Sequence, residues 1–421
     1  MAGSKKKNLG VWRIVRDFFR LDYILCTALV FALMYGFKDL FERTNFLNPI
    51  ETALSDFEMS DMIYSVGIRD QPGPDTNIVL VNIGNLPRRL IARQIEAIAA
   101  QKPKVVGIDA SFVEEKDPYG DSLLDDALGK VDNLVMYGFL NHKEKSSIGP
   151  FDTLELCNPR FARHGVPGFV NLITPGKDEF HVCRTFSPID SVAGKKYLCF
   201  ALQMAWYEDS LKVKEFLSRN NSAEIINFRG NSNYFYNMDC SDVLGRDDAS
   251  GFYQPAEIPV NLKGKIVFLG FMGGSFEEAP NTVSDKFHTP LNERYAGKSY
   301  PDMFGVTIHA NIASMVLRGK PTDSMGFGGY ILLAVILCYL NVVFFFYIHE
   351  YYPTSYDLVV KTIQIVQVGL VLYLSIYIHG VYNYKIEVST AAFALGFSGD
   401  VLEVYVGIKE KIVARFRRIF A

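Results

Sequence analysis

Six polar residues in the middle of the chain are the side chains best suited to do chemistry. One aspartate directly follows the apolar run VVGI, three residues fall in the element D-x-x-H-T-P, and two fall in G-x-x-x-H-A-N further on. Ligands usually bind in the crevice at the carboxyl ends of strands in an open α/β sheet. We therefore take as candidate ligand-binding residues, for a small molecule or a cation, Asp109, Asp285, His288, Thr289, His309 and Asn311.

A structural interpretation of the same residues is simpler, and the sequence favours it. The two aspartates can cap turns or helix ends, the Thr-Pro pair can fix a loop, and the H-A-N residues can fasten a helix by buried hydrogen bonds. The glycine-rich stretch Gly270–Ser275 also has backbone N–H groups that could hold an anion. Ligand contact and structural support therefore stay open as alternatives.

Enzymatic chemistry finds little support in the residues. The stretch Gly270–Ser275 has the spacing of neither the dinucleotide fingerprint nor the P-loop. No nucleophile, base and orienting group occur in a recognisable set, and no Cys/His spacing is typical of a metal site. We expect a protein that is not an enzyme and has no catalytic residues, no cofactor and no metal.

Short apolar runs alternate with helical patterns around these candidates and would position them. The predicted strands are NIVLVNIG (77–84), KVVGIDASF (104–112), NLVMYGFL (133–140), EIINFRG and KIVFLGFMGG, and FVNLITPG with HVCRTFSPI is a predicted hairpin across Pro175–Asp178. Helices are predicted after the first strand, near Asp121–Leu128, over Lys195–Arg219, and from Gly305 straight into the next apolar segment. The first strand, helix and second strand form a βαβ unit, so the pattern predicts an α/β domain with a mainly parallel sheet.

This order of elements, with the two motifs above, resembles the CHASE-type extracellular sensor domains of the second class (CHASE2-like). The resemblance covers about Asn77 to Lys320. It implies a domain of the kind found outside many bacterial kinases, adenylate cyclases and diguanylate cyclases, with one membrane span before it and about three after it. Two features depart from the family: Asn82, Gly84 and Asn85 stand where its first strand usually ends in acidic residues, and no catalytic output domain follows the last apolar segment.

Four apolar segments agree with that membrane layout. The predicted organisation is a basic cytoplasmic N-terminus (1–20), a span (21–41), an extracytoplasmic sensor domain (42–325), spans at 327–349, 358–379 and 386–408, and a basic cytoplasmic tail (409–421). Lys and Arg gather before the first span and after the last, which predicts that both termini are cytoplasmic and the large domain is on the other side. The resemblance implies that the membrane is a bacterial inner membrane and that the large domain lies in the periplasm. A cleaved signal peptide is the alternative for the N-terminus, but no small-x-small site follows the first apolar run.

Four cysteines fall in the predicted exterior domain, whereas Cys26 and Cys338 fall in spans. An even number of exterior cysteines permits disulfides. We expect at least one bridge, although buried thiols are the alternative; the possible partners are Cys157, Cys183, Cys199 and Cys240.

Polar residues also occur inside the predicted spans, where ionisable groups are costly unless they face partners. Opposite charges at matching depth predict pairing inside the bundle. Bundle or oligomer cohesion, docking of a partner's membrane helix, and a proton relay are the open interpretations for Asn341, Lys361, Gln364, Asp400 and Glu403.

Two classes of function fit this organisation. One is a sensor-like membrane protein that receives an exterior signal or partner and relays it to a separate protein. The other is a non-sensing scaffold subunit of an envelope complex. Either requires the membrane and a homo-oligomer or a membrane-protein partner, with an unknown small-molecule ligand in the first case. A net charge of -3 gives no sign of nucleic-acid binding.

Overall fold

The chain divides into two compact units that are described separately. A computed structural model describes residues 20–44, 61–65, 73–142, 151–173, 182–245, 257–273, 285–292 and 300–419. One unit, here called the α/β unit, is Tyr64–Thr322, and the other, the helical unit, is Met1–Ile63 with Asp323–Ala421. The predicted turn Pro175–Asp178 and nearly all of the basic N-terminus lie outside the described residues.

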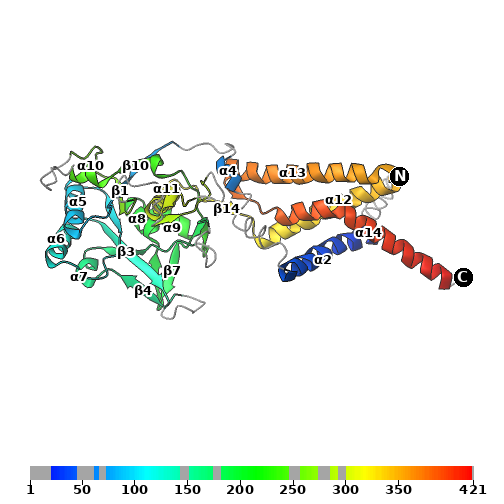
Figure 1. The fold of residues 1–421 in the computed structure, drawn as a ribbon, viewed down its shortest axis with the longest axis horizontal. Helices are drawn as coiled ribbons and strands as arrows, with labels where there is room; N and C mark the ends of the chain where they lie inside the picture. Colours follow the sequence, from blue (N-terminus) through cyan, green and yellow to red (C-terminus); the bar gives the residue numbers. More distant parts are fainter. Residues whose placement is uncertain are drawn as a thin grey trace, which may run out of the picture. The chain divides into compact units, whose positions relative to one another are not determined.

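A seven-stranded, mainly parallel sheet forms the centre of the α/β unit (Figure 1). Its strands are β1 (Asp75–Asn82), β2 (Val105–Asp109), β3 (Leu134–Asn141), β4 (Thr153–Leu156), β5 (Val166–Phe169), β10 (Phe235–Met238) and β11 (Ile266–Gly270). The order is β10-β1-β11-β2-β3-β4, and β5 also pairs with β3. Only the pairing of β3 with β4 is antiparallel among these strands. The predicted mixed α/β fold with a mainly parallel sheet is confirmed.

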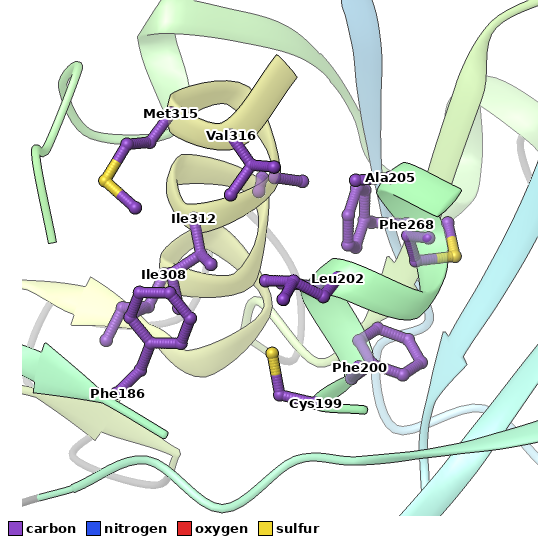
Figure 2. Packing of buried hydrophobic residues seen from close by; sticks show 14 of the residues in the cluster. Phe186, Cys199, Phe200, Leu202, Ala205, Phe268, Ile308, Ile312, Met315 and Val316 are labelled. Carbon is purple, nitrogen blue, oxygen red and sulfur yellow. The ribbon is translucent and has the colours of Figure 1, made fainter. Parts of the chain in front are cut away.

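Helices cover both faces of this sheet. The side chains of a strand alternate between the two faces, and apolar side chains on both faces must be buried. Val79 and Val81 lie in one buried cluster, which helices α5 (Arg88–Ala100) and α6 (Pro118–Leu128) cover. Ile78 and Leu80 lie in the cluster on the other face. There α8 (Phe200–Glu208) packs against α11 (Gly305–Leu317), with Leu202 between the two helices and Ile308 beside Phe186 (Figure 2).

Glycine permits the closest of these contacts. At Gly107 in β2, a Cβ atom would lie 2.4 Å from Met204 Sδ of α8. At Gly270, the last residue of β11, it would lie 2.8 Å from Val306 Cβ of α11. A Cβ at Gly270 would therefore force α11 away from the strand, whereas one at Gly107 would force the side chains of Met204 and Phe200 to shift.

The long helix predicted over Lys195–Arg219 is wrong. Residues Lys195–Leu198 form β8, which pairs with β7 (Ile189–Val192) across Ala193 and Gly194. Both turn residues have positive φ, 51° and 79°, as a tight hairpin turn requires. The remainder is split in two, because Asp209 is extended and caps α9 (Ser210–Leu217) through the amides of Leu211 and Lys212.

The strand predicted for EIINFRG is also mostly wrong. Only β9 (Glu224–Ile225) is a strand, and it pairs with β6 (Thr185–Phe186) outside the main sheet. The reason is that the backbone N–H groups of Arg229 and Gly230 donate to the Asn311 side chain instead of to a neighbouring strand. Of the predicted hairpin, the described residues retain one antiparallel bridge, Ile173 to Thr185.

Smaller elements complete the α/β unit. They are α4 (Met62–Ser65, at the boundary between the units), α7 (Pro159–Ala162), the 3-10 helix η2 (Ser232–Tyr234), α10 (Cys240–Leu244), β12 (Lys286–Phe287) and β13 (Met303–Phe304). Helix α11 does not continue into the next apolar helix as predicted, because Arg318–Thr322 and β14 (Asp323–Ser324) follow it.

The helical unit consists of α2 (Leu21–Thr44), α12 (Phe327–Tyr351), α13 (Tyr356–Tyr382) and α14 (Ser389–Ile419), with the 3-10 turn η3 (Pro353–Ser355) before α13. Three stretches are long and apolar enough to cross a membrane, Phe327–Tyr351, Pro353–Tyr382 and Ser389–Phe416, whereas Leu21–Gly36 is a shorter apolar helix. Strand β14 pairs with β15 (Tyr384–Lys385), which joins α13 to α14. The start of α12 is thereby tied to the connection between α13 and α14.

Candidate functional site

Three strands end side by side at the carboxyl edge of the sheet. Asn82 of β1 lies opposite Gly270 of β11, and Gly270 lies opposite Asp109 of β2. The Asn82 side chain is fully engaged: it donates to Asp239 Oδ1 (2.8 Å) and to the Gly273 carbonyl (3.0 Å) and accepts from the Gly84 and Met272 amides. Asn82 therefore fixes loops at this edge. Of the three residues Asn82, Gly270 and Asp109, Asp109 is the one whose side chain is available to bind a ligand.

A cleft opens next to Asp109 and is here called the edge cleft. Its volume is about 720 Å³. Three of the six candidates predicted from the sequence line it, namely Asp109, Asp285 and His309. These residues come from β2, from the residue before β12, and from α11, so the tertiary structure brings together side chains that are far apart in the chain.

Asp109 is the electrostatically unusual group of the edge cleft. Burial, and then the nearby Asp285 carboxylate, raise the pKa of Asp109 from 3.8 to about 7. Asp285 itself has a left-handed backbone (φ 58°), and its carbonyl accepts a hydrogen bond from the Gly305 amide (3.1 Å). An aspartate tolerates this conformation better than most residues, and strained backbone is more common at functional sites than elsewhere.

His309 is the most buried candidate, with 2% of its surface exposed. Burial lowers the pKa of His309 from 6.5 to about 4, although a hydrogen bond to the Val170 backbone opposes that change. Its ring lies edge-on to Phe200, with 5.4 Å between ring centroids. Its Nδ1 atom has no hydrogen-bond partner. A neutral imidazole with one unused nitrogen therefore stands at the wall of the edge cleft.

The other three candidates do not line the edge cleft. Thr289 is bound to Asp302, which accepts from the Thr289 amide (2.8 Å) and hydroxyl (2.5 Å). Burial raises the pKa of Asp302 to about 6, and those hydrogen bonds act against the increase. The His288 carbonyl accepts from the Cys183 amide (2.8 Å). Both residues thus support the loop around β12.

Asn311 has a structural place as well. Its Oδ1 accepts from the Arg229 amide (2.7 Å), and its Nδ2 donates to the carbonyls of Gly230 (3.0 Å) and Thr307 (2.9 Å). This is the buried fastening of α11 that the structural interpretation predicts. The anion cradle predicted at Gly270–Ser275 is partly outside the described residues, and the amide of Met272 within it is already bound to Asn82.

Sequence reasoning missed the aromatic side chains of the edge cleft. Tyr137, Phe139, Phe271 and Phe287 line it. Tyr137 and Phe139 follow the fully buried part of β3, whose burial there changes from continuous to alternating. The usable signal in the sequence was their position, because they lie at the carboxyl end of the strand predicted after β2, and in a parallel sheet that end lies near Asp109.

Metal binding and disulfide bonding complete the inventory of the α/β unit. Within the described ranges, no three His, Cys, Asp or Glu side chains are close enough to hold a metal ion. All six cysteines are free, so the structure contradicts the expected disulfide. Cys157 belongs to the cluster on one face of the sheet, and Cys183 and Cys199 belong to the cluster on the other. Burial raises the pKa of both Cys183 and Cys199 to about 12, as suits inert core thiols.

A second polar group lies in the helical unit. Asn341 of α12 donates to Ser398 Oγ (2.7 Å) and accepts from Gln367 Nε2 (2.9 Å). Gln364 donates to the carbonyls of Leu395 (3.1 Å) and Gly396 (2.8 Å). These bonds tie α12, α13 and α14 together, as bundle cohesion would require.

The predicted charge pair forms, but on the surface of the helices. Lys361 Nζ lies 2.5 Å from Asp400 Oδ1. The two side chains are 52% and 53% exposed, and Glu403 is exposed beside them. The expectation that these charges point into the bundle is therefore wrong, since Gln364 and Asn341 already fill the buried positions between the helices.

Comparison with known proteins gives one result. The CHASE2 domain family matches residues 26–343. Searches of the curated proteins and of the solved structures found no match. Because the match covers most of the chain, including every residue of the edge cleft, the chain belongs to the CHASE2 family of extracellular sensor domains.

Proposed function

We propose that this CHASE2 protein is a receptor of a bacterial cytoplasmic membrane that detects a small ligand outside the cell membrane and relays the event to a separate protein. The α/β unit lies in the periplasm, α2, α12, α13 and α14 cross the membrane, and both termini are cytoplasmic, as the Lys and Arg at the ends of the chain favour. The protein has no catalytic activity of its own in this proposal.

One observation carries the proposal: the helix that lines the edge cleft is joined to the membrane helices by a short segment without slack. Gly305, Val306 and His309 of α11 line the edge cleft. Only Arg318–Thr322 separate α11 from β14, and β14 leads into α12. A displacement of α11 on ligand binding would therefore reach the helical unit through five residues.

Hydrogen bonds hold this segment along its length. The Lys320 carbonyl accepts from Asn227 Nδ2 (2.9 Å), and Thr322 forms a β-bridge with Ile225. The next residue, Asp323, donates its amide to the Asn383 carbonyl (2.9 Å) in the helical unit. A segment held in this way transmits a displacement, whereas a free linker would absorb it.

The relay can be tested by hydrogen exchange on the full chain in lipid nanodiscs. Asp109→Asn removes the charge repulsion of the edge cleft, as a bound cation would, and we expect it to change amide exchange in β14 and β15. Inserting Gly-Gly-Ser-Gly between Thr322 and Asp323 should abolish the change in β14 and β15 but keep it in β2 and α11.

The matched control is the same insertion between Ser146 and Ser147, remote in sequence from the connecting segment, which should leave the response of β14 and β15 intact. Identical exchange of β14 and β15 in the parent and in Asp109→Asn would refute the relay.

A scaffold subunit is the second candidate function, and the exposed Lys361–Asp400 pair supports it. Charges on a lipid-facing surface are stable only with partners, and a neighbouring membrane helix would supply them. A scaffold should purify in mild detergent at fixed stoichiometry with its partner, whatever residue stands at position 109. A receptor should instead show an association that changes with Asp109→Asn.

A further inference from the structure

The acidic side chains that line the edge cleft are two aspartates. Asp109 and Asp285 present carboxylates, and no described residue donates a hydrogen bond to either side chain. His309 forms part of the wall of the edge cleft, and its buried Nδ1 has no hydrogen-bond partner. The described lining contains no Lys or Arg. The ligand must therefore bring the positive charge.

The apolar part of the wall indicates what kind of molecule the edge cleft can hold. The four aromatic side chains lie beside Ile83, Val170, Leu172 and Val306. A volume of about 720 Å³ suits an organic molecule, and a bare ion would leave most of it unused. Aromatic faces next to carboxylates also favour a cation, because the ring quadrupole attracts positive charge.

We propose that the edge cleft binds a small organic amine in its protonated form, with the ammonium group between Asp109 and Asp285 and an aromatic or apolar body against Tyr137 and Phe287. The assignment rests on the proposed function, since it names the class of ligand for that receptor.

A bound ammonium group would offset the repulsion between the carboxylates of Asp109 and Asp285. Without a cation, the carboxylate of Asp285 disfavours ionisation of Asp109. A cation between them favours the ionised form of Asp109. An anion of the same shape would meet two carboxylates without a compensating cation. The edge cleft should therefore bind the cation more tightly than an anion of the same shape.

The test uses the full chain in nanodiscs at pH 8 and three amines, tyramine, phenethylamine and putrescine. Binding is followed by calorimetry and by the melting temperature. The matched controls are 3-(4-hydroxyphenyl)propionate, which replaces the ammonium by a carboxylate, and 4-ethylphenol, which has neither charge. We expect tyramine to bind most tightly and both controls to fail.

Substitutions assign the site. Asp109→Asn should weaken tyramine binding at least tenfold, and Asp285→Asn should weaken it as well. Asp126→Asn, at an exposed aspartate of α6 outside the edge cleft, should have no effect. The proposal is overturned if all three amines fail, if the carboxylate control binds equally well, if Asp109→Asn leaves binding unchanged, or if CaCl₂ or MgCl₂ gives the Asp109-dependent shift instead.

The two proposals can fail separately. If tyramine binds but exchange of β14 and β15 does not respond, the ligand class stands and the relay falls. If no amine binds but Asp109→Asn still changes exchange of β14 and β15, the relay stands and the ligand class falls.

Discussion

Replacing Asp109 by asparagine should stabilise the α/β unit at neutral pH. The pKa of Asp109 is 3.8 before folding and about 7 in the folded protein, so above pH 7 folding must carry an already ionised carboxylate into an unfavourable place. That difference is worth at most about 4 kcal/mol. Because water reaches the partly exposed carboxylate from the edge cleft, we expect a gain of about 2 kcal/mol, or roughly 5 °C in melting temperature.

The size of the effect depends on pH. Near pH 4 the carboxyl is largely protonated in the folded chain and about half protonated in the unfolded chain, so asparagine should change stability little. Between pH 4 and pH 7 the parent loses stability, because the carboxyl ionises in the unfolded chain while the folded chain still holds its proton, and the substituted protein does not. The advantage of asparagine should therefore grow over this interval and level off above it. Asp285, Tyr137 and His309 face the same cleft, so the comparison is always between parent and variant at one pH.

Thermal unfolding of the full chain in detergent, followed by intrinsic fluorescence at pH 4.5, 6 and 8, measures this advantage. Asp126→Asn serves as the control and should match the parent at each pH. The reasoning is refuted if Asp109→Asn is no more stable than the parent at pH 8, or if its advantage is the same at pH 4.5. If Asp109→Asn raises the melting temperature and also abolishes amine binding, then Asp109 supports binding at the expense of stability.

Four further results are expected. His309→Gln should make the free energy of unfolding depend less on pH below pH 6.5. The pKa of His309 is about 4 in the folded parent and 6.5 when unfolded, so the parent loses up to about 3 kcal/mol as pH falls from 6.5 to 4. Urea titrations that give both proteins the same dependence on pH would contradict this. Asn341→Leu should cost about 1 to 2 kcal/mol in detergent unfolding, since it leaves Ser398 and Gln367 without their partner, and no loss would remove the cohesive role of these bonds. Asp400→Lys with Glu403→Lys should abolish co-purification of a membrane partner identified by mass spectrometry, and retained association would exclude docking at that surface. All six thiols should react with iodoacetamide after unfolding without reductant, and a protected pair would restore the disulfide prediction.

Local patterns in the sequence predicted the parts of the fold that local physics decides. The apolar runs of β1, β2, β3 and β11 and the amphipathic α5 were all found, because burial on two faces or on one face leaves a recognisable period. The predictions failed where single residues override a pattern. Ala193 and Gly194 turn a helical stretch into a hairpin, and Asp209 starts a new helix where periodicity suggested continuity.

The sequence by itself determined the α/β class, the apolar helices and the residue types of the edge cleft. Tertiary structure alone decided that β11 lies between β1 and β2. Strand pairing is non-local, so the pattern of one strand does not say which neighbour it takes. The position of β11 between β1 and β2 places Gly270 beside Asp109. Because Gly270 has no side chain, Val306 of α11 can pack closely against it, which brings His309 to the edge cleft. Two carboxylates and one unpaired imidazole nitrogen, separated widely in the chain, thus become one candidate site.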